Sequence, residues 1–149
     1  MDYSWFWKKL DQFLVENSLK QTQQRKQVIE CFLKAEPHID AERVYEDVHH
    51  LNPAIGLATV YRTLNLLNEA GLVLQCQFRD GRVIYELKVP DTHHDHLICT
   101  MCQMIVEFED KEIEKRQEII ADKYQFRLTS HRLDLFGICS SCYKNSTQV

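Results

Sequence analysis

Two Cys-x-x-Cys pairs, Cys99 with Cys102 and Cys139 with Cys142, constrain the fold of this chain more than any other feature. Each pair can present two sulfur atoms to one tetrahedral centre, and a set of four thiolates is typical of structural zinc. Because four thiolates leave no open position, we expect one zinc ion per chain with a structural role. Four unrelated reduced cysteines, or a redox dithiol, are the alternatives, although a redox dithiol requires only one pair.

Residues 93–96 form a second cluster of metal-ligand types, His93-His94-Asp95-His96, directly before an apolar stretch. In an extended chain, alternate side chains point to opposite faces. His94 and His96 would then share one face, and His93 and Asp95 would share the other. The tetrapeptide can therefore begin two separate metal sites, with a solvated histidine cluster as the alternative.

The first 87 residues have the pattern of four helices followed by two strands. Apolar spacing predicts helices over residues 4–16, 23–33, 41–51 and 58–70, and strands over residues 73–78 and 83–87. Thr22 is placed to cap the second helix and Gly71 to end the fourth. Between the strands, Arg79-Asp80-Gly81-Arg82 is predicted to be a hairpin turn, because Asp-Gly tolerates positive φ. This order is that of a winged helix-turn-helix domain over residues 1–87, with a generic helical domain as the alternative.

The fourth predicted helix would be the recognition helix, because its apolar residues leave one polar face toward solvent. That face carries Thr59, Tyr61, Arg62 and Asn65, and recognition helices contact base edges and phosphates through such positions. Lys20 and Arg25 belong to a supporting basic patch. The net charge of −4, with acidic residues outnumbering basic ones in both halves, argues against DNA binding. Phosphate contacts would therefore have to come from a local patch, helped by bound cations.

The pattern changes after a linker at residues 88–92, which is marked by Val89-Pro90-Asp91. Beyond it, strands are predicted over residues 97–98, 104–108, 126–128 and 133–137, with a helix over residues 110–123. We therefore expect an α+β protein with a second, small α/β domain over residues 93–149. No apolar run approaches the roughly 20 residues that a membrane span needs. Charged residues interrupt the aromatic N-terminal segment, so we expect a cytoplasmic protein with no membrane partner.

Two stretches of this sequence resemble the ferric uptake regulator family: residues 93–109, HHDHLICTMCQMIVEFE, and residues 56–65, GLATVYRTLN. Three shorter motifs occur in the same order: TQQR at residues 22–25, His38-x-x-Ala41-Glu42, and LTSH at residues 128–131. The resemblance implies a transcriptional repressor and not an enzyme. It further implies a homodimer or higher oligomer, joined through the second domain. The N-terminal domains of such a protein read an inverted repeat in double-stranded DNA when a divalent metal is bound.

The resemblance also implies three metal sites. A regulatory site that bridges the two domains would use His38, Glu86, His94, His96 and Glu107. An additional site would use His93, Asp95, Glu114 and His131. The four cysteines match the structural zinc site of the family. The sequence departs from the family at Gln24, where proline is frequent, and in the spacing from Glu86 to His94, which is about one residue longer.

Three imidazoles and two carboxylates make a mixed nitrogen and oxygen site that suits Fe²⁺, Mn²⁺, Co²⁺ or Zn²⁺. Peroxide sensors of the family tend to have aspartates there, so Glu86 and Glu107 favour iron sensing and the control of iron uptake genes. Zinc sensors tend to recruit a cysteine, and only Cys76 is a candidate. A peroxide- or zinc-sensing regulator is the alternative, followed by a non-haem metalloenzyme and by a zinc-stabilised protein-interaction module.

Overall fold

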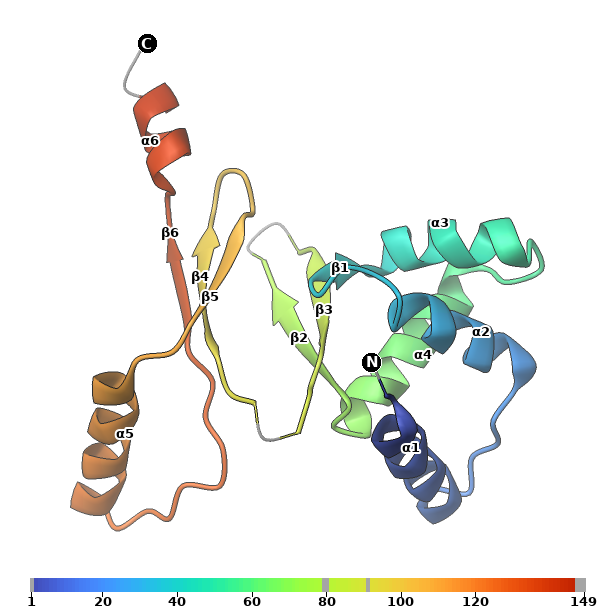
Figure 1. The fold of residues 1–149 in the computed structure, drawn as a ribbon, viewed down its shortest axis with the longest axis horizontal. Coiled ribbons are helices and arrows are strands. Elements are labelled where there is room, and N and C mark those ends of the chain that lie inside the picture. The colour runs from blue at the N-terminus through green and yellow to red at the C-terminus, as the bar shows by residue number, and fades with distance from the viewer. Residues whose placement is uncertain (1, 79–80, 91, 147–149) are drawn as a thin grey trace. The chain divides into compact units, whose positions relative to one another are not determined.

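The computed structural model describes residues 2–78, 81–90 and 92–146, and the chain divides into two compact units, Met1–Pro90 and Asp91–Val149 (Figure 1). Both units mix helices with a small three-stranded sheet, which makes the protein α+β. The division falls within the linker expected at residues 88–92. Among the described residues, no helix is both long enough and apolar enough to span a membrane.

The first unit contains the four predicted helices and the two predicted strands. The helices are α1 (Ser4–Glu16), α2 (Gln23–Phe32), α3 (Ala41–Leu51) and α4 (Leu57–Glu69), and the strands are β2 (Val73–Gln77) and β3 (Val83–Leu87). A further strand, β1 (Ile39–Asp40), pairs antiparallel with β3 and completes a sheet of order β1-β3-β2. Two residues are too few for an alternating pattern, so β1 was not predicted. Arg79 and Asp80 of the predicted turn lie outside the described residues, while Gly81 has φ +89°.

Local hydrogen bonds explain where these helices begin and end. Thr22 Oγ1 accepts from the Arg25 backbone N–H at 3.2 Å, and Asp40 Oδ1 accepts from Arg43 N–H at 2.8 Å, so each residue caps the helix after it. Gly71, with φ +63°, ends α4 in a left-handed turn. The Gly71 and Leu72 N–H groups donate back into the last turn of α4, each at 2.9 Å. The chain therefore turns sharply from α4 into β2.

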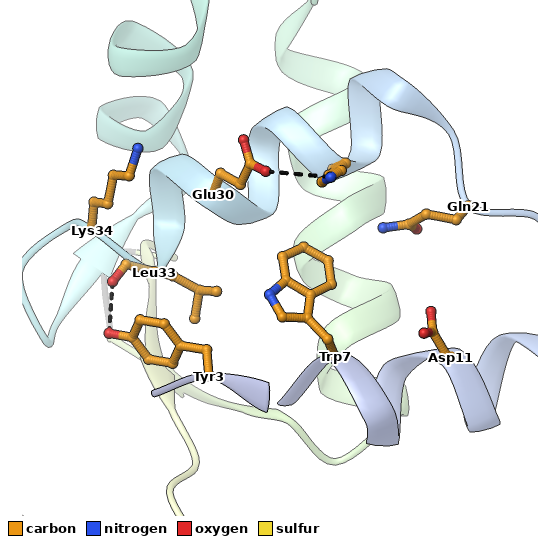
Figure 2. A pocket seen from close by; sticks show the side chains of 8 residues that line it. Tyr3, Trp7, Asp11, Gln21, Glu30, Leu33 and Lys34 are labelled. Carbon is orange, nitrogen blue, oxygen red and sulfur yellow. Dashed lines mark hydrogen bonds and ion pairs between the residues drawn. The ribbon is translucent and has the colours of Figure 1, made fainter. Parts of the chain in front are cut away.

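The core of the first unit lies between its helices and one face of its sheet. Val60, Leu64 and Leu67 of α4 are fully buried, as predicted for the inward face of that helix. Helix α1 contributes Phe6, Leu10 and Leu14 to the same core. A pocket of about 520 Å³ lies between α1 and α2, and Trp7 is one of its lining residues (Figure 2). At the same place, the Tyr3 hydroxyl donates a hydrogen bond to Leu33 O at 2.9 Å. The aromatic N-terminal segment is therefore a packed helix of this unit.

The second unit has a sheet of order β5-β4-β6, in which β4 pairs antiparallel with β5 and parallel with β6. Its elements are β4 (Asp95–Cys99), β5 (Ile105–Phe108), α5 (Lys111–Lys123), β6 (Asp134–Gly137) and α6 (Ser140–Ser146). The strand predicted over residues 126–128 is wrong. These residues lie in the irregular connection from α5 to β6 and pair with no strand among the described residues. Phe126 is 72% exposed, and its backbone N–H donates to Ala121 O at the end of α5. Helix α6 was not predicted, because its sequence, SSCYKNS, has no apolar periodicity.

One face of the second sheet carries an apolar row. Leu97 of β4 lies opposite Val106 of β5 and Leu135 of β6, and directly paired residues share a face. The three side chains are 47%, 43% and 40% exposed. A contiguous apolar surface of this kind is typical of a protein–protein contact.

Candidate metal centres

The first centre consists of the four cysteines, which the second sheet brings together. Cys99 ends β4, and its parallel pairing with Gly137 carries Cys139 alongside it. The Sγ atoms of Cys102 and Cys139 are 3.7 Å apart, and the Cys139 backbone N–H donates to Cys99 Sγ at 3.3 Å. All four sulfur atoms, Cys142 included, lie within 4.8 Å of one another. The two Cys-x-x-Cys pairs thus form one cluster that can surround a single ion.

The protonation of these thiols favours a bound dication. The backbone N–H of Cys139, followed by those of Cys102 and Met101, lowers the pKa of Cys99 to about 6. The opposite holds for Cys142, whose thiol hydrogen-bonds to Cys139 and Cys102, and its pKa is raised to about 12. Four adjacent sulfurs cannot all be thiolates at neutral pH without a compensating cation. Zinc coordinates four thiolates in a closed tetrahedron, so the donor set fits structural zinc.

A second centre, within the same unit, gathers His93, Asp95, Glu114 and His131. His93 Nε2 lies 3.3 Å from Asp95 Oδ1 and 3.2 Å from Glu114 Oε1. His131 Nε2 also lies 3.2 Å from Glu114 Oε1, and 2.8 Å from His93 Nε2. The segment before β4, helix α5 and the connection to β6 thus each contribute to one cluster of four ligand atoms.

The hydrogen-bond partners of the buried oxygens in this cluster indicate whether it suits a metal. Asp95 is 1% exposed, and neither of its carboxylate oxygens accepts a hydrogen bond from any residue that the structure describes. The same holds for Glu114 Oε1 and for Gln117 Oε1, one helical turn further along α5. Buried carboxylate oxygens without donors are costly unless a cation compensates them. Two imidazole nitrogens with two carboxylates fit a divalent transition metal.

The remaining predicted ligands form two groups, one in each unit. In the first unit, His38 precedes β1 and Glu86 lies in β3, with His38 Nε2 3.6 Å from Glu86 Oε2. In the second unit, the rings of His94 and His96 are 5.2 Å apart, and Glu107 of β5 lies opposite His96 of β4. The first group offers two ligands and the second offers three. Each group alone is smaller than the five-ligand set predicted from the sequence.

Asp134 is a residue of this region that the sequence analysis missed. Its Oδ1 lies 3.2 Å from His96 Nδ1, and Arg132 holds its other oxygen at 2.6 Å. A carboxylate on Nδ1 orients an imidazole so that Nε2 is presented to a metal. The parallel pairing of His96 with Asp134 creates this contact between residues 38 positions apart. No local sequence signal marks such a pair.

The predicted DNA-contact residues of α4 differ in how they are held. Arg62 is exposed, and its Nε donates to Ala58 O at 3.1 Å. The Tyr61 hydroxyl donates to Glu42 Oε1 at 2.7 Å, and this bond raises the pKa of Tyr61 to about 12. Thr59 is half-buried. Asn65 is exposed, and its Oδ1 accepts from Gln75 Nε2 at 2.9 Å, a contact that the sequence analysis also missed.

The two predicted basic residues lie just before and within α2. Lys20 is exposed, and the Arg25 guanidinium donates to the Lys20 carbonyl oxygen. This bond holds the Arg25 side chain against the backbone near the start of α2, where the helix dipole also favours an anion. The arrangement provides local positive charge in a unit that is acidic as a whole.

Comparison with known proteins places these features in one family. The model of the ferric uptake regulator family matches residues 16–136. The ferric uptake regulation protein of Bordetella parapertussis is 44% identical over 136 residues, which cover 90% of this chain and 97% of the relative. The crystal structure of the Vibrio cholerae ferric uptake regulator is 43% identical, with a TM-score of 0.72, and covers 87% of this chain and 98% of its own. The Helicobacter pylori ferric uptake regulator, described as having three functional metal binding sites, is 29% identical. Its TM-score is 0.82, over 96% of this chain and 95% of its own.

Proposed function

This chain belongs to the ferric uptake regulator family, and on that premise we propose that it is a transcriptional repressor controlled by a divalent metal. The observation that carries the proposal is the division of metal ligands between the two units. His38 and Glu86 lie together in the first unit. In the second unit, His96 and Glu107 lie opposite each other in two paired strands, and His94 lies beside His96 just before β4. Two incomplete ligand groups become one regulatory site if both bind the same ion.

A shared ion would restrict how the two units move relative to each other. Such a switch works only if the DNA-competent arrangement binds the metal more tightly than the other arrangements do. His38 and Glu86 would supply the ligands of the DNA-binding unit, while Asp134 would hold His96 in the orientation that binding requires. In a dimer, the ligands would thereby set the separation of the two recognition helices, which has to match the spacing of the half-sites.

Fe²⁺ is the regulatory metal that we propose, with Mn²⁺, Co²⁺ and Zn²⁺ as substitutes. Three imidazoles and two glutamates form a mixed set that accommodates all four ions. Affinity alone would favour zinc over iron, so the metal available in the cell decides. The relatives named for ferric uptake regulation support iron. The cysteine centre would hold structural Zn²⁺, and the His93, Asp95, Glu114 and His131 centre would hold an additional divalent ion.

The second unit would join two copies of the chain. Its apolar row of Leu97, Val106 and Leu135 is the surface that a second copy would cover. A two-fold dimer reads an inverted repeat, because each copy contacts one half-site. Tyr61 and Arg62 would contact the DNA from α4, with Thr59 and Asn65 beside them and Lys20 and Arg25 on phosphates. We propose that the protein acts in the cytoplasm, where operator DNA and reduced cysteines occur together.

A selection experiment tests this function. Duplexes are selected from a random DNA library by the zinc-loaded protein, anaerobically, with Fe²⁺, with Mn²⁺, with added Zn²⁺ and with a chelator that spares the cysteine-bound zinc. The proposal predicts an inverted repeat that is enriched with Fe²⁺ and Mn²⁺ and lost with the chelator. Enrichment with Zn²⁺ alone would instead identify a zinc sensor. Absence of any metal-dependent enrichment would contradict the function.

A further inference from the structure

The sheet of the first unit has two faces, and strand register assigns its residues to them. Ile39 of β1, Tyr85 of β3 and Gln75 of β2 lie directly opposite one another and therefore share a face. Glu86 follows Tyr85 in β3, so its side chain points to the other face. His38 precedes Ile39 and lies on that same other face, which agrees with its 3.6 Å approach to Glu86. Metal ligands and the Tyr85 row thus occupy opposite sides of one sheet.

The Tyr85 row holds the recognition helix through one side chain. Asn65 of α4 accepts two hydrogen bonds on Oδ1, from Gln75 Nε2 at 2.9 Å and from the Tyr85 hydroxyl at 3.4 Å. Tyr85 is 2% exposed and belongs to the core between the sheet and the helices, so its ring is fixed by packing. Both donors come from the sheet and the acceptor comes from α4. A movement of β3 relative to α4 would stretch or break these bonds.

A second series of hydrogen bonds connects the same sheet to α4, through β1 and the start of α3. Asp40, the last residue of β1, caps α3 by accepting from Arg43 N–H at 2.8 Å. Glu42, in the first turn of α3, accepts from the Tyr61 hydroxyl at 2.7 Å. The strand that follows His38 is therefore linked, through the start of α3, to a proposed DNA-contact residue. All three strands of the sheet thus reach α4 through short series of hydrogen bonds, β2 and β3 through Asn65 and β1 through the start of α3.

We propose that Gln75 and Tyr85 are positioning residues that couple metal binding to DNA binding by fixing α4, through Asn65, to the sheet that carries His38 and Glu86. This inference rests on the proposed function. It assigns Asn65 a structural acceptor role on its carbonyl oxygen, which leaves only its amide N–H groups to donate to DNA. Ligands on one face of a rigid sheet hold the sheet in place, and the hydrogen bonds on the other face transmit that placement to the recognition helix.

The test measures how strongly metal improves DNA affinity in a variant without the two donors. Gln75→Ala with Tyr85→Phe removes both donors but keeps the buried aromatic ring. The probe is the duplex that the parent protein selects most strongly in Mn²⁺, and dissociation constants are measured with and without Mn²⁺ at one ionic strength. Gln77→Ala, at an exposed glutamine two residues along β2, is the matched control. Mn²⁺ affinity is measured separately by electron paramagnetic resonance.

The proposal predicts that the double variant binds Mn²⁺ like the parent and binds DNA without metal like the parent. Its gain in DNA affinity on adding Mn²⁺ should fall by roughly 2- to 30-fold, as for other residues along a coupling route, while Gln77→Ala keeps the full gain. A full gain in the double variant would overturn the proposal. An equal loss of DNA affinity with and without Mn²⁺ would also overturn it, because such a loss indicates a direct DNA contact or a less stable α4. If thermal denaturation shows the double variant unfolded, Gln75→Ala alone, which removes the shorter of the two hydrogen bonds and leaves the buried Tyr85 in place, is measured in the same way. A parent protein without any gain would refute the proposed function itself.

Discussion

His93 Nε2 lies 2.8 Å from His131 Nε2, although the two histidines are 38 positions apart in the chain. Glu114 Oε1 lies 3.2 Å from both nitrogens. A proton shared between the two imidazoles would form one hydrogen bond between their Nε2 atoms. The buried oxygens of Asp95 and Glu114 would still have no hydrogen-bond donor among the described residues. A divalent cation would satisfy all four groups at once, and this relationship supports the additional metal centre that we propose.

Removing the buried carboxylate should empty this centre. Asp95→Asn keeps the size of the side chain but removes its charge, so Mn²⁺ affinity at this centre should fall by roughly tenfold or more, as even outer-shell changes have such effects. Isothermal titration should show one binding step fewer than in the parent protein. Asp122→Asn, at an exposed position of α5, is the control and should retain every step. An unchanged number of steps in Asp95→Asn would exclude Asp95 as a ligand.

The cysteine cluster should be essential for folding of the second unit. Structural zinc can contribute on the order of 10 kcal/mol to folding, so Cys99→Ser should lose zinc and the second unit should unfold. Elemental analysis and circular dichroism measure both effects, and Cys76→Ser should keep one zinc per chain. Because binding requires thiolates and the pKa of Cys142 is raised to about 12, zinc affinity should weaken as the pH falls. A folded, reduced parent protein without zinc would contradict this account.

Association of two chains should depend on the apolar row of the second sheet. Leu97→Glu places a charge between Val106 and Leu135, where a second copy would have to bury it at considerable cost. Sedimentation analysis should therefore show a monomer with zinc still bound. Gln23→Glu adds the same charge at an exposed position in the first unit and should leave the dimer intact. A dimeric Leu97→Glu protein would place the interface elsewhere.

Arg62 should contribute to DNA affinity without affecting the metal centres. If the side chain contacts a base bidentately, Arg62→Ala should cost about 1–3 kcal/mol, at one operator position only. If it contacts a phosphate, the loss should be uniform across sequences and the salt dependence should fall by about one charge. Fluorescence anisotropy with a set of single-base operator variants separates the two cases. Unchanged affinity for every duplex would remove Arg62 from the DNA-binding surface.

Local sequence signals predicted most of the fold. The helices at Ser4–Glu16 and Ala41–Leu51 agree with their predicted bounds, and α4 ends before Gly71 because only glycine adopts φ +63° there at no cost. The strand predicted over residues 126–128 failed because apolar residues alone do not supply a pairing partner. Strand β1 was missed because its two residues become a strand only through tertiary pairing with Ile84 and Tyr85.

The candidate sites show the same division between local and long-range information. Alternation along residues 93–96 separated His93 and Asp95 from His94 and His96, and the structure groups Asp95 with His93 and places His94 beside His96. The role of Asp134 could not be predicted, because it depends on the register of β4 and β6, which are distant in sequence. The role of Gln75 could not be predicted, because it depends on how α4 packs against β2. Metal-ligand types are visible in a sequence, whereas the residues that orient them are visible only after folding.

The central claim, that ligands from both units bind one regulatory metal, is tested most directly by a metal-titrated DNA-binding curve at fixed ionic strength. Moving a two-state population from about 1:99 to 99:1 takes roughly 5.5 kcal/mol of differential binding, and loss of one bridging ligand should remove a large part of it. His38→Ala and His96→Ala should therefore fold, keep the cysteine-bound zinc and dimerise, yet gain no DNA affinity when Fe²⁺ or Mn²⁺ is added. His50→Ala, at an exposed position near the end of α3, should respond like the parent protein. A parent-like gain in both His38→Ala and His96→Ala would contradict the bridging mechanism and would leave charge screening as the action of the metal.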